Sequence, residues 1–226
     1  MRWGGWAFLV LFFANSILAA AQNSSSTGVA TVSSEDLLTQ PVADNWTSYN
    51  GDYTGRRFSR LGQITPSNVG QLRAAWVFHP GNSRLLEVTP VVVRGIMYVT
   101  SSNDVFALDA KTGRTLWQYQ RPVSSGLLDD AAAHKNRGVA VWKDFVYSET
   151  DDAHLLCLDA RSGGLIWDIQ YAEKEKHYGA TSAPLEINGT VIVGTSGGDS
   201  GVRGFLEAHD AVTGKLKWHL WTIPGP

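Results

Sequence analysis

The sequence predicts an all-β fold, a β-propeller of which the chain contains about three four-stranded blades and one further strand on their N-terminal side. The prediction rests on three similar decapeptides, each ending in a tryptophan: LDAKTGRTLW (108–117), LDARSGGLIW (158–167) and HDAVTGKLKW (209–218). Their tryptophans follow one another at intervals of 50 and 51 residues. A period of about 50 residues with four strand-length runs in each unit is typical of propeller blades. The 23 glycines and 9 tryptophans agree with a turn-rich β protein.

Turn residues divide each unit into four strands. In the third unit Asn188-Gly189 separates two β-forming runs and predicts a tight hairpin. Asp210 and Gly214 mark a later turn, because an aspartate can bond nearby backbone and a glycine can adopt a positive φ. The tryptophan that ends each unit is expected to pack between neighbouring blades. Blade units are expected at about 85–120, 138–170 and 182–221.

Upstream of these units, residues 69–78 resemble a fourth strand without the first three. A lone outer strand at this place is what a ring closed by its N-terminus would use. Three blades and one strand cannot close a propeller, since closed rings need about four to eight blades. The sequence is therefore expected to be an incomplete propeller, ending at Pro226 directly after a blade with an unpaired strand edge.

The first 44 residues differ in composition from the repeats. Arg2 is followed by an apolar run over 6–14, and Ala19 and Ala21 fit a cleavage site. Residues 1–21 therefore predict a cleaved signal peptide and export to the periplasm, with an uncleaved membrane anchor as the alternative. Residues 22–44 contain few large apolar side chains and are expected to form a flexible leader before the propeller portion at 45–226.

Composition and charge exclude several classes of protein. An apolar content of 43% is enough to bury a core. A net charge of -2 gives no electrostatic footprint for a nucleic-acid partner. Cys157 is the single cysteine, which excludes an intrachain disulfide and a cysteine-based zinc site, and its apolar neighbours favour a buried structural thiol.

The segments between the blade motifs carry a more specific signal. From Asn45 to Pro226 the chain resembles the quinoprotein alcohol dehydrogenases, whose eight-bladed propeller holds pyrroloquinoline quinone (PQQ) and a calcium or lanthanide ion on its axis. The stretches that carry the resemblance are WTSYNGD (46–52), RFSRL (57–61), NRGVA (136–140) and GVRGF (201–205).

The resemblance implies a PQQ-dependent oxidation of a small alcohol. Hydride would pass from the substrate to the metal-bound quinone, and the electrons to a cytochrome c or a membrane quinone. Oxidation of a sugar such as glucose, or of a polyol, is the nearest enzymatic variant.

Three residues match family positions that bind the quinone. The resemblance implies that Glu87 and Arg137 bond the cofactor and that the Thr181 hydroxyl donates to one of its carboxylates. An arginine is suited to this role, because its fork of donors matches both quinone oxygens and carboxylates. The alternatives are a surface acid for Glu87, a surface salt bridge for Arg137 and an ordinary strand start for Thr181.

The glycine-rich stretch GTSGGDSG (194–201) matches a further part of the family's site. Ser196, Gly197 and Gly198 stand where the family contacts the cofactor, and Asp199 where it supplies a carboxylate to the metal. Hard cations such as calcium prefer oxygen donors of this kind. The alternative is a turn between two strands.

The sequence departs from the family pattern in three respects. Asp199 stands where the alcohol enzymes usually have glutamate. Its side chain is shorter by one methylene group, so the sequence does not specify which metal ion binds. Ala131 and Ala132 occupy the positions of the family's adjacent cysteine pair, as in the subset of relatives without that disulfide. The metal-binding asparagine, the catalytic aspartate and the tryptophan below the cofactor belong to later blades, so the catalytic residues are expected beyond residue 226.

Two other functions compete with the enzyme. A non-catalytic propeller of the PQQ type could serve as a scaffold for protein assembly. A truncated remnant would retain half of a cofactor site without a function. The combination of Glu87, Arg137 and the stretch 196–199 favours the dehydrogenase, since a scaffold has no use for it.

Overall fold

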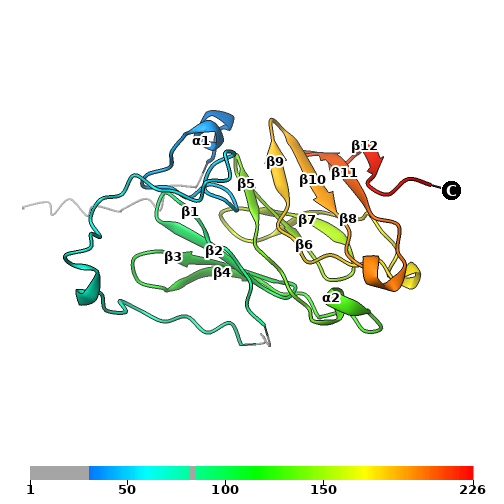
Figure 1. Cartoon of the computed structure of the whole chain (residues 1–226), viewed down its shortest axis with the longest axis horizontal. Helices are drawn as coiled ribbons and strands as arrows, with labels where there is room; N and C mark the ends of the chain where they lie inside the picture. Colours follow the sequence, from blue (N-terminus) through cyan, green and yellow to red (C-terminus); the bar gives the residue numbers. More distant parts are fainter. Residues whose placement is uncertain (1–30, 82–84, 226) are drawn as a thin grey trace, which may run out of the picture.

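The computed structural model describes residues 31–81 and 85–225. Its centre consists of three antiparallel sheets of four strands each, and within each sheet the strands follow one another in sequence order (Figure 1). Blade 1 contains β1 (Val91–Val93), β2 (Ile96–Ser101), β3 (Asp104–Asp109) and β4 (Thr115–Tyr119). Blade 2 contains β5 (Ala140–Trp142), β6 (Phe145–Glu149), β7 (His154–Asp159) and β8 (Leu165–Gln170). Blade 3 contains β9 (Leu185–Ile187), β10 (Thr190–Gly194), β11 (Phe205–Asp210) and β12 (Leu216–Trp221).

Helical segments are short and lie before the blades, between them or, for one of them, between β10 and β11 of blade 3. They are α1 (Ser34–Leu38), η1 (Val69–Gln71), α2 (Asp129–Ala132), η2 (Lys174–Lys176) and η3 (Gly198–Ser200). None of the helices in the described residues has the length and hydropathy needed to cross a membrane. The all-β prediction of an incomplete propeller with three four-stranded blades is confirmed.

The hairpins form where the turn residues predict them. Asn188 and Gly189, between β9 and β10, both have positive φ, at 48° and 75°. A two-residue turn in which both residues have positive φ matches the right-handed twist of the two antiparallel strands that it connects. In the third turn of each blade, an aspartate accepts hydrogen bonds from the residues that follow it: Asp109 Oδ1 accepts from the Thr112 amide and hydroxyl, both at 2.8 Å. Asp159 and Asp210 repeat the arrangement.

The repeat tryptophans join one blade to the next. Trp117 of β4 donates its indole N–H to the Ala160 carbonyl in blade 2 at 2.9 Å. Trp167 of β8 donates in the same way to the Val212 carbonyl in blade 3 at 3.0 Å. The expected packing between blades is confirmed. Trp218, in the last described blade, is 41% exposed.

The segment 69–78 differs from its expected strand. Residues 69–71 form η1, and residues 72–78 have no regular secondary structure. The described residues contain no strand placed to form a ladder with this segment, and a strand needs such a partner. Trp76 nevertheless donates its indole N–H to the Ala110 carbonyl at 3.2 Å, so it occupies the place that Trp117 and Trp167 take on the following blades.

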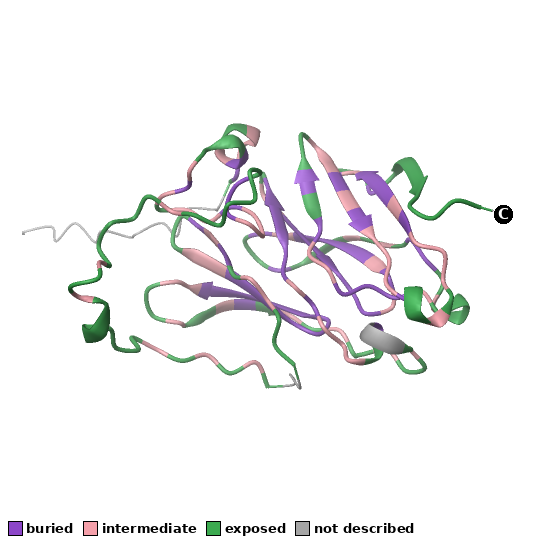
Figure 2. Ribbon diagram, in the orientation of Figure 1, coloured by how far each residue is buried: buried purple, intermediate pink, exposed green. Residues whose placement is uncertain are grey.

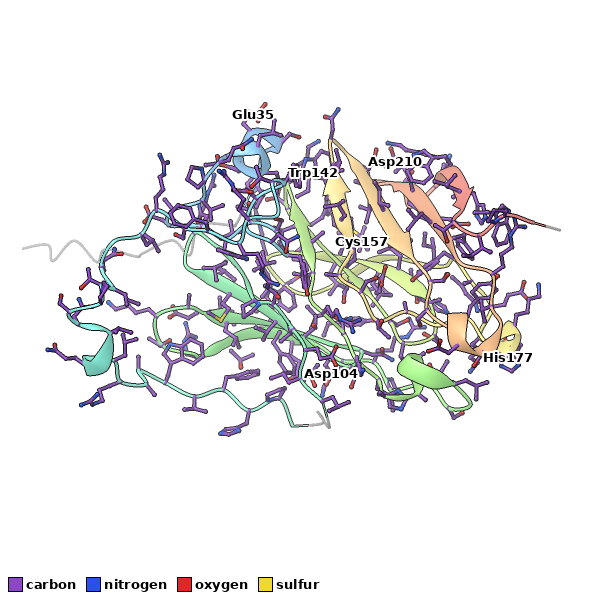
Figure 3. All side chains as sticks on the ribbon, in the orientation of Figure 1. Glu35, Asp104, Trp142, Cys157, His177 and Asp210 are labelled. Atoms are coloured by element: carbon purple, nitrogen blue, oxygen red, sulfur yellow. The ribbon has the colours of Figure 1, made fainter. Side chains whose placement is uncertain are left out.

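The described part of the expected leader, residues 31–44, packs on the blades. Val32 is fully buried and exchanges two backbone hydrogen bonds with Lys143, between β5 and β6. Leu37 of α1 is also buried, and the indole N–H of Trp142 donates to Ser34 Oγ at 3.2 Å (Figure 3). A few apolar side chains suffice because each meets a preformed apolar surface. The predicted signal peptide, residues 1–21, lies outside the described residues.

The core is richest in blade 2. Four consecutive residues of β7, at 155–158, have no exposed surface, and burial extends along the neighbouring strands (Figure 2). Cys157 lies among them, and burial raises the pKa of its thiol to about 12. A thiol with this pKa stays protonated at neutral pH and does not react as a nucleophile. The prediction of a buried structural cysteine is confirmed.

Candidate cofactor site

Three predicted cofactor residues are brought into contact at equivalent places in the three blades. Glu87, Arg137 and Thr181 each lie a few residues before the first strand of their blade. Arg137 Nη2 forms an ion pair with Glu87 Oε2 at 2.8 Å. Its Nη1 donates to both the carbonyl and the hydroxyl of Thr181, each at 2.8 Å. The guanidinium of blade 2 therefore links the blade 1 and blade 3 residues, which a simple surface salt bridge would not do.

A second cation, which the sequence did not predict, belongs to this group. Lys135 Nζ lies 3.3 Å from Glu87 Oε1. The side chains of Lys135, Arg137 and Glu87 retain 17%, 31% and 35% of their exposure. Lys135 and Arg137 thus bring two cationic groups to one half-buried place, and groups of this kind attract anionic ligands. The signal available in the sequence was a basic residue two positions before Arg137.

The loop that carries Arg137 is fixed by its neighbours. Asn136 is 5% exposed and its Oδ1 accepts from the Thr100 hydroxyl at 2.7 Å and from the Gly138 amide at 2.8 Å. Its Nδ2 donates to the Glu149 carbonyl at 2.8 Å. Gly138 has a φ of 131°, a region that side chains with a Cβ rarely adopt. These contacts hold the Arg137 backbone in place without using its side chain.

The glycine-rich stretch forms a second part of the site, next to Thr181. The Ser196 amide donates to the Gly179 carbonyl at 2.8 Å, and the Gly179 amide to the Ser196 carbonyl at 3.3 Å. Ser196 Oγ is buried and has no hydrogen-bond partner among the described residues. A buried hydroxyl without a partner is uncommon, and a ligand is one way to satisfy it.

Gly197 and Gly198 follow in the same loop. Gly197 has a φ of 116°, and a Cβ there would lie 2.6 Å from the His177 carbonyl oxygen. Only glycine fits this position. Gly198 begins η3, is exposed and has free space around its Cα. Their backbone amides, and not side chains, are what this stretch can offer a ligand.

Asp199 is exposed on η3 and is not brought together with other acids. Among the described residues, no group of three or more histidine, cysteine, aspartate or glutamate side chains is arranged to hold a metal ion. Calcium takes six to eight oxygen ligands. The described residues alone therefore do not form a metal centre, and metal binding by Asp199 stays a prediction.

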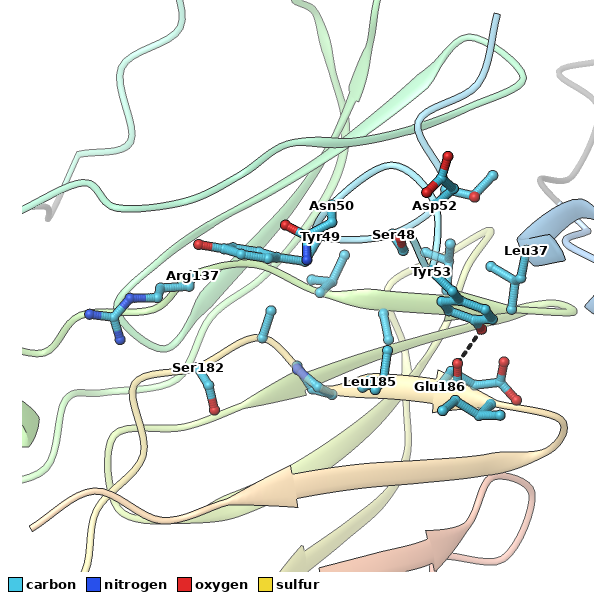
Figure 4. A pocket seen from close by; sticks show the side chains of 17 residues that line it. Leu37, Ser48, Tyr49, Asn50, Asp52, Tyr53, Arg137, Ser182, Leu185 and Glu186 are labelled. Atoms are coloured by element: carbon cyan, nitrogen blue, oxygen red, sulfur yellow. Dashed lines mark hydrogen bonds between the residues drawn. The ribbon is translucent and has the colours of Figure 1, made fainter. Parts of the chain in front are cut away.

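A pocket of about 480 Å³ begins at Arg137 and runs along the first strands of blades 2 and 3 (Figure 4). Its walls include Tyr49, Tyr53 and Ser182, and Tyr53 donates its hydroxyl to the Glu186 carbonyl at the far end. Burial raises the pKa of the Glu186 carboxyl to about 7, although nearby backbone amides oppose this effect. Of the predicted cofactor residues, Arg137 lines this pocket, whereas Glu87 and Thr181 do not, and Ser196 lines a separate hollow with Gly198.

Glu149, behind this pocket, is a second carboxyl with an unusual environment. It is 1% exposed, and its Oε2 accepts from Ser182 Oγ at 2.8 Å. Its Oε1 has no hydrogen-bond partner among the described residues. Burial raises the pKa of Glu149 to about 7. Hydrogen bonds from Ser182 and from the Gly194 backbone act in the opposite direction and lower this pKa. Sequence reasoning missed this residue because its neighbours come from three separate segments.

The PQQ family profile, described as the β-propeller domain of glucose/ethanol/alcohol dehydrogenases, matches residues 46–226. The chain belongs to this family. The resemblance that the sequence motifs indicated is thereby confirmed, and this PQQ propeller chain carries its predicted cofactor residues within the matched range.

Two named relatives show which proteins the PQQ propeller chain is similar to. Quinohemoprotein alcohol dehydrogenase ADH IIB of Pseudomonas putida is 42% identical over 189 residues, which cover 83% of this chain and 27% of the relative. The dehydrogenase subunit of alcohol dehydrogenase (quinone) from Gluconacetobacter polyoxogenes is 38% identical over 216 residues, which cover 92% of this chain and 29% of the relative. The chain thus spans less than a third of the length of these relatives.

Solved structures agree with the sequence comparison. Quinohemoprotein alcohol dehydrogenase ADHIIG from Pseudomonas putida HK5 superimposes with a TM-score of 0.78 at 38% identity, covering 87% of this chain and 29% of that one. A europium-containing methanol dehydrogenase superimposes with a TM-score of 0.77 at 36% identity, covering 85% and 34%. The partial coverage of both agrees with an incomplete propeller.

Proposed function

We propose that the chain forms the N-terminal part of the cofactor site of a PQQ-dependent alcohol dehydrogenase. The observation that carries the proposal is the contact of Arg137 with both Glu87 and Thr181, which joins three blades at one point. Family membership supports it. The proposed substrate is a small primary or secondary alcohol, with a sugar or polyol as the nearest variant.

The donors present fit a quinone that carries three carboxylates. Arg137 and Lys135 supply positive charge, and the hydroxyls of Thr181 and Ser196 can donate hydrogen bonds. Hydrogen bonds to charged groups are about twice as strong as neutral ones, so the two cations would contribute most of the affinity. Glu87, already held by both cations, would orient them and limit their combined charge.

When bound, PQQ supplies the redox chemistry, taking up the two electrons and the hydrogen that leave the alcohol. The residues of this chain bind and orient the quinone. No catalytic base is assigned to them, and the catalytic aspartate is expected beyond residue 226. A calcium or lanthanide ion at Asp199 is part of the proposal, with its other ligands supplied from outside the described residues.

The partners and the location follow from the same assignment. The proposed electron acceptor is a cytochrome c or a membrane quinone. The proposed location is the periplasm, reached through cleavage of the predicted signal peptide at residues 1–21. Export and cleavage are tested by N-terminal sequencing of the mature chain from a periplasmic extract, which should begin at Gln22.

The cofactor assignment is tested by titrating the full chain with PQQ and following the quinone absorbance. We expect saturable binding that Arg137→Gln weakens by about tenfold or more, because a half-buried charge-assisted contact is lost. Arg161→Gln, in an exposed turn of blade 2, is the matched control and should bind as the unmodified chain does. Absence of binding, or equal effects of the two substitutions, would contradict the proposal.

A scaffold function is the second candidate, and one observation favours it. The outer strand of blade 3 exposes Leu216 and Leu220 at 55% each, together with Trp218. An exposed apolar strand of this kind can pair with another chain. A chain that melts cooperatively and elutes as a stable assembly, yet does not bind PQQ, would support the scaffold over the enzyme.

A further inference from the structure

A connecting segment joins blade 1 to blade 2 and leads into the candidate site. We call residues 121–135 the strap; it follows β4, contains α2 and leads to Arg137. At its base lies Asp151, which follows β6 and is 2% exposed. The Asp151 carboxylate accepts hydrogen bonds from the Ser124 amide at 3.0 Å and from His134 Nδ1 at 2.7 Å. It therefore holds the strap on both sides of α2.

The same residue also contacts blade 1 and the segment that leads to Thr181. Asn103, in the turn between β2 and β3, donates its Nδ2 to the Asp151 carboxylate at 2.9 Å and to the Pro122 carbonyl at 3.0 Å. The Asp151 amide donates back to Asn103 Oδ1 at 2.8 Å. The Asp151 carbonyl accepts from the Ala180 amide at 3.2 Å. One buried residue thus connects the strap to the blade 3 side of the site.

The strap places α2 against the buried hydroxyl of the site. Ala131 of α2 is 3% exposed and packs on Gly179. A Cβ on Gly179 would lie 2.3 Å from the Ala131 Cβ, 2.9 Å from the Asp151 carbonyl oxygen and 3.3 Å from Ser196 Oγ. These three groups therefore surround one small space. Ala131 forms the cover over the side of the loop where the free Ser196 hydroxyl lies.

We propose that Asp151 is a positioning residue of the PQQ site, which holds α2 in place as the wall beside Ser196. The proposal rests on the proposed function and extends it to a residue outside the predicted cofactor contacts. The chain has no covalent link that could do this, because residues 131 and 132 are alanines and Cys157 is buried in β7. Hydrogen bonds to a buried carboxylate are strong, and an asparagine cannot replace all of them, since it keeps one acceptor oxygen and its amide nitrogen would face at least one of the three donors.

The first test measures how often α2 leaves the site. In Ala131→Cys the new thiol is shielded by the strap, whereas Cys157 stays inert because its thiol is buried and protonated. We expect Asp151→Asn to raise the rate of thiol labelling at position 131 by about tenfold or more. Glu207→Gln is the matched control, since Glu207 is also a buried carboxylate that contacts histidines, His209 and His219, but lies in blade 3 away from the strap. It should leave the labelling rate unchanged.

A second measurement avoids the cysteine. Hydrogen exchange of the strap amides should accelerate in Asp151→Asn and not in Glu207→Gln, while amides of β7 stay protected in both. Equal protection of the strap in the unmodified chain and in Asp151→Asn would overturn the proposal. So would faster exchange spread over the whole chain, because that indicates a general loss of stability.

Measurements with PQQ distinguish a failure of this proposal from a failure of the proposed function. PQQ should slow the labelling of Ala131→Cys, and Asp151→Asn should weaken PQQ binding by about tenfold while Glu207→Gln does not. If PQQ binds but leaves the labelling rate unchanged, α2 is not a wall of the site and the proposal is wrong. If PQQ does not bind the unmodified chain, the proposed function is contradicted. Thiol labelling and hydrogen exchange then test only whether Asp151 holds the strap in place.

Discussion

The indole of Trp117 packs so closely on Gly163 that a Cβ on this glycine would lie 2.5 Å from the ring. Gly163 also has a positive φ of 71°. The repeat glycine is therefore needed for two reasons, backbone conformation and lack of space, and the second reason belongs to the contact between blades.

Gly163→Ala should destabilise the chain more than a substitution that strains the backbone alone. Gly95→Ala is the matched control, because Gly95 has a similar φ of 81° but free space around it. We expect the free energy of unfolding to fall by about 2 kcal/mol more for Gly163→Ala, owing to the displaced tryptophan. Urea unfolding of the two variants measures the difference. Equal losses would mean that the indole moves aside at no cost.

Stability should depend on pH through Glu149. The pKa of this carboxyl is about 7 in the folded chain and near 4.5 in an exposed reference state. The folded chain therefore binds the proton more tightly, so the contribution of Glu149 to stability is full below pH 4.5 and is lost as the pH rises towards 7. Glu149→Gln removes this loss and should stabilise the chain at pH 8, relative to the unmodified chain, by up to about 3 kcal/mol.

The measurement is urea unfolding of both proteins between pH 4.5 and pH 8. Other carboxyl groups titrate equally in the two, so the difference between the curves isolates Glu149. A difference that stays constant over this range would contradict the raised pKa.

Lys135 should contribute to the binding of PQQ. Replacing it with methionine keeps most of the side chain and removes the charge, so Lys135→Met should weaken binding by about threefold to tenfold and reduce its dependence on salt. Lys111→Met, in an exposed turn of blade 1, serves as the control. PQQ titrations at two ionic strengths provide the measurement. If both variants respond to salt as the unmodified chain does, Lys135 does not face the ligand.

Alanine substitutions at the two central glycines of the glycine-rich loop should differ in their effect on thermal stability. Gly197→Ala adds a methyl group 2.6 Å from the His177 carbonyl in a backbone region that favours glycine, whereas Gly198→Ala adds one in open space. We expect Gly197→Ala to lower the thermal midpoint by several degrees and Gly198→Ala to change it little. Calorimetry of the two variants decides this point. Similar midpoints would mean that the loop adapts to a side chain at either position.

Much of the fold could be predicted because local signals agree with the repeat. The Asn188-Gly189 turn and β10 at Thr190–Gly194 fall where the sequence places them, since turn chemistry and strand propensity act over a few residues. Residues 69–78 show the limit of this reasoning. Their strand-like pattern is real, but a strand also needs a partner, and none is placed beside this segment in the described part of the chain.

The site was predictable where motifs carried it and not where long-range contacts did. Glu87, Arg137 and Thr181 come from segments that resemble one family, and the structure joins all three. Asp151 and Glu149 resemble ordinary strand-end acids in the sequence. Their burial depends on side chains from segments tens of residues away, which no short pattern encodes.

The tryptophan contacts all run in one direction, which makes each outer tryptophan dependent on the blade that follows it in the chain. Trp76 bonds a carbonyl 34 residues ahead of it, Trp117 one 43 residues ahead and Trp167 one 45 residues ahead. Each indole therefore precedes in the chain the turn that receives it. Blades 1 and 2 therefore each leave their outer tryptophan without its carbonyl partner until the turn of the following blade has formed.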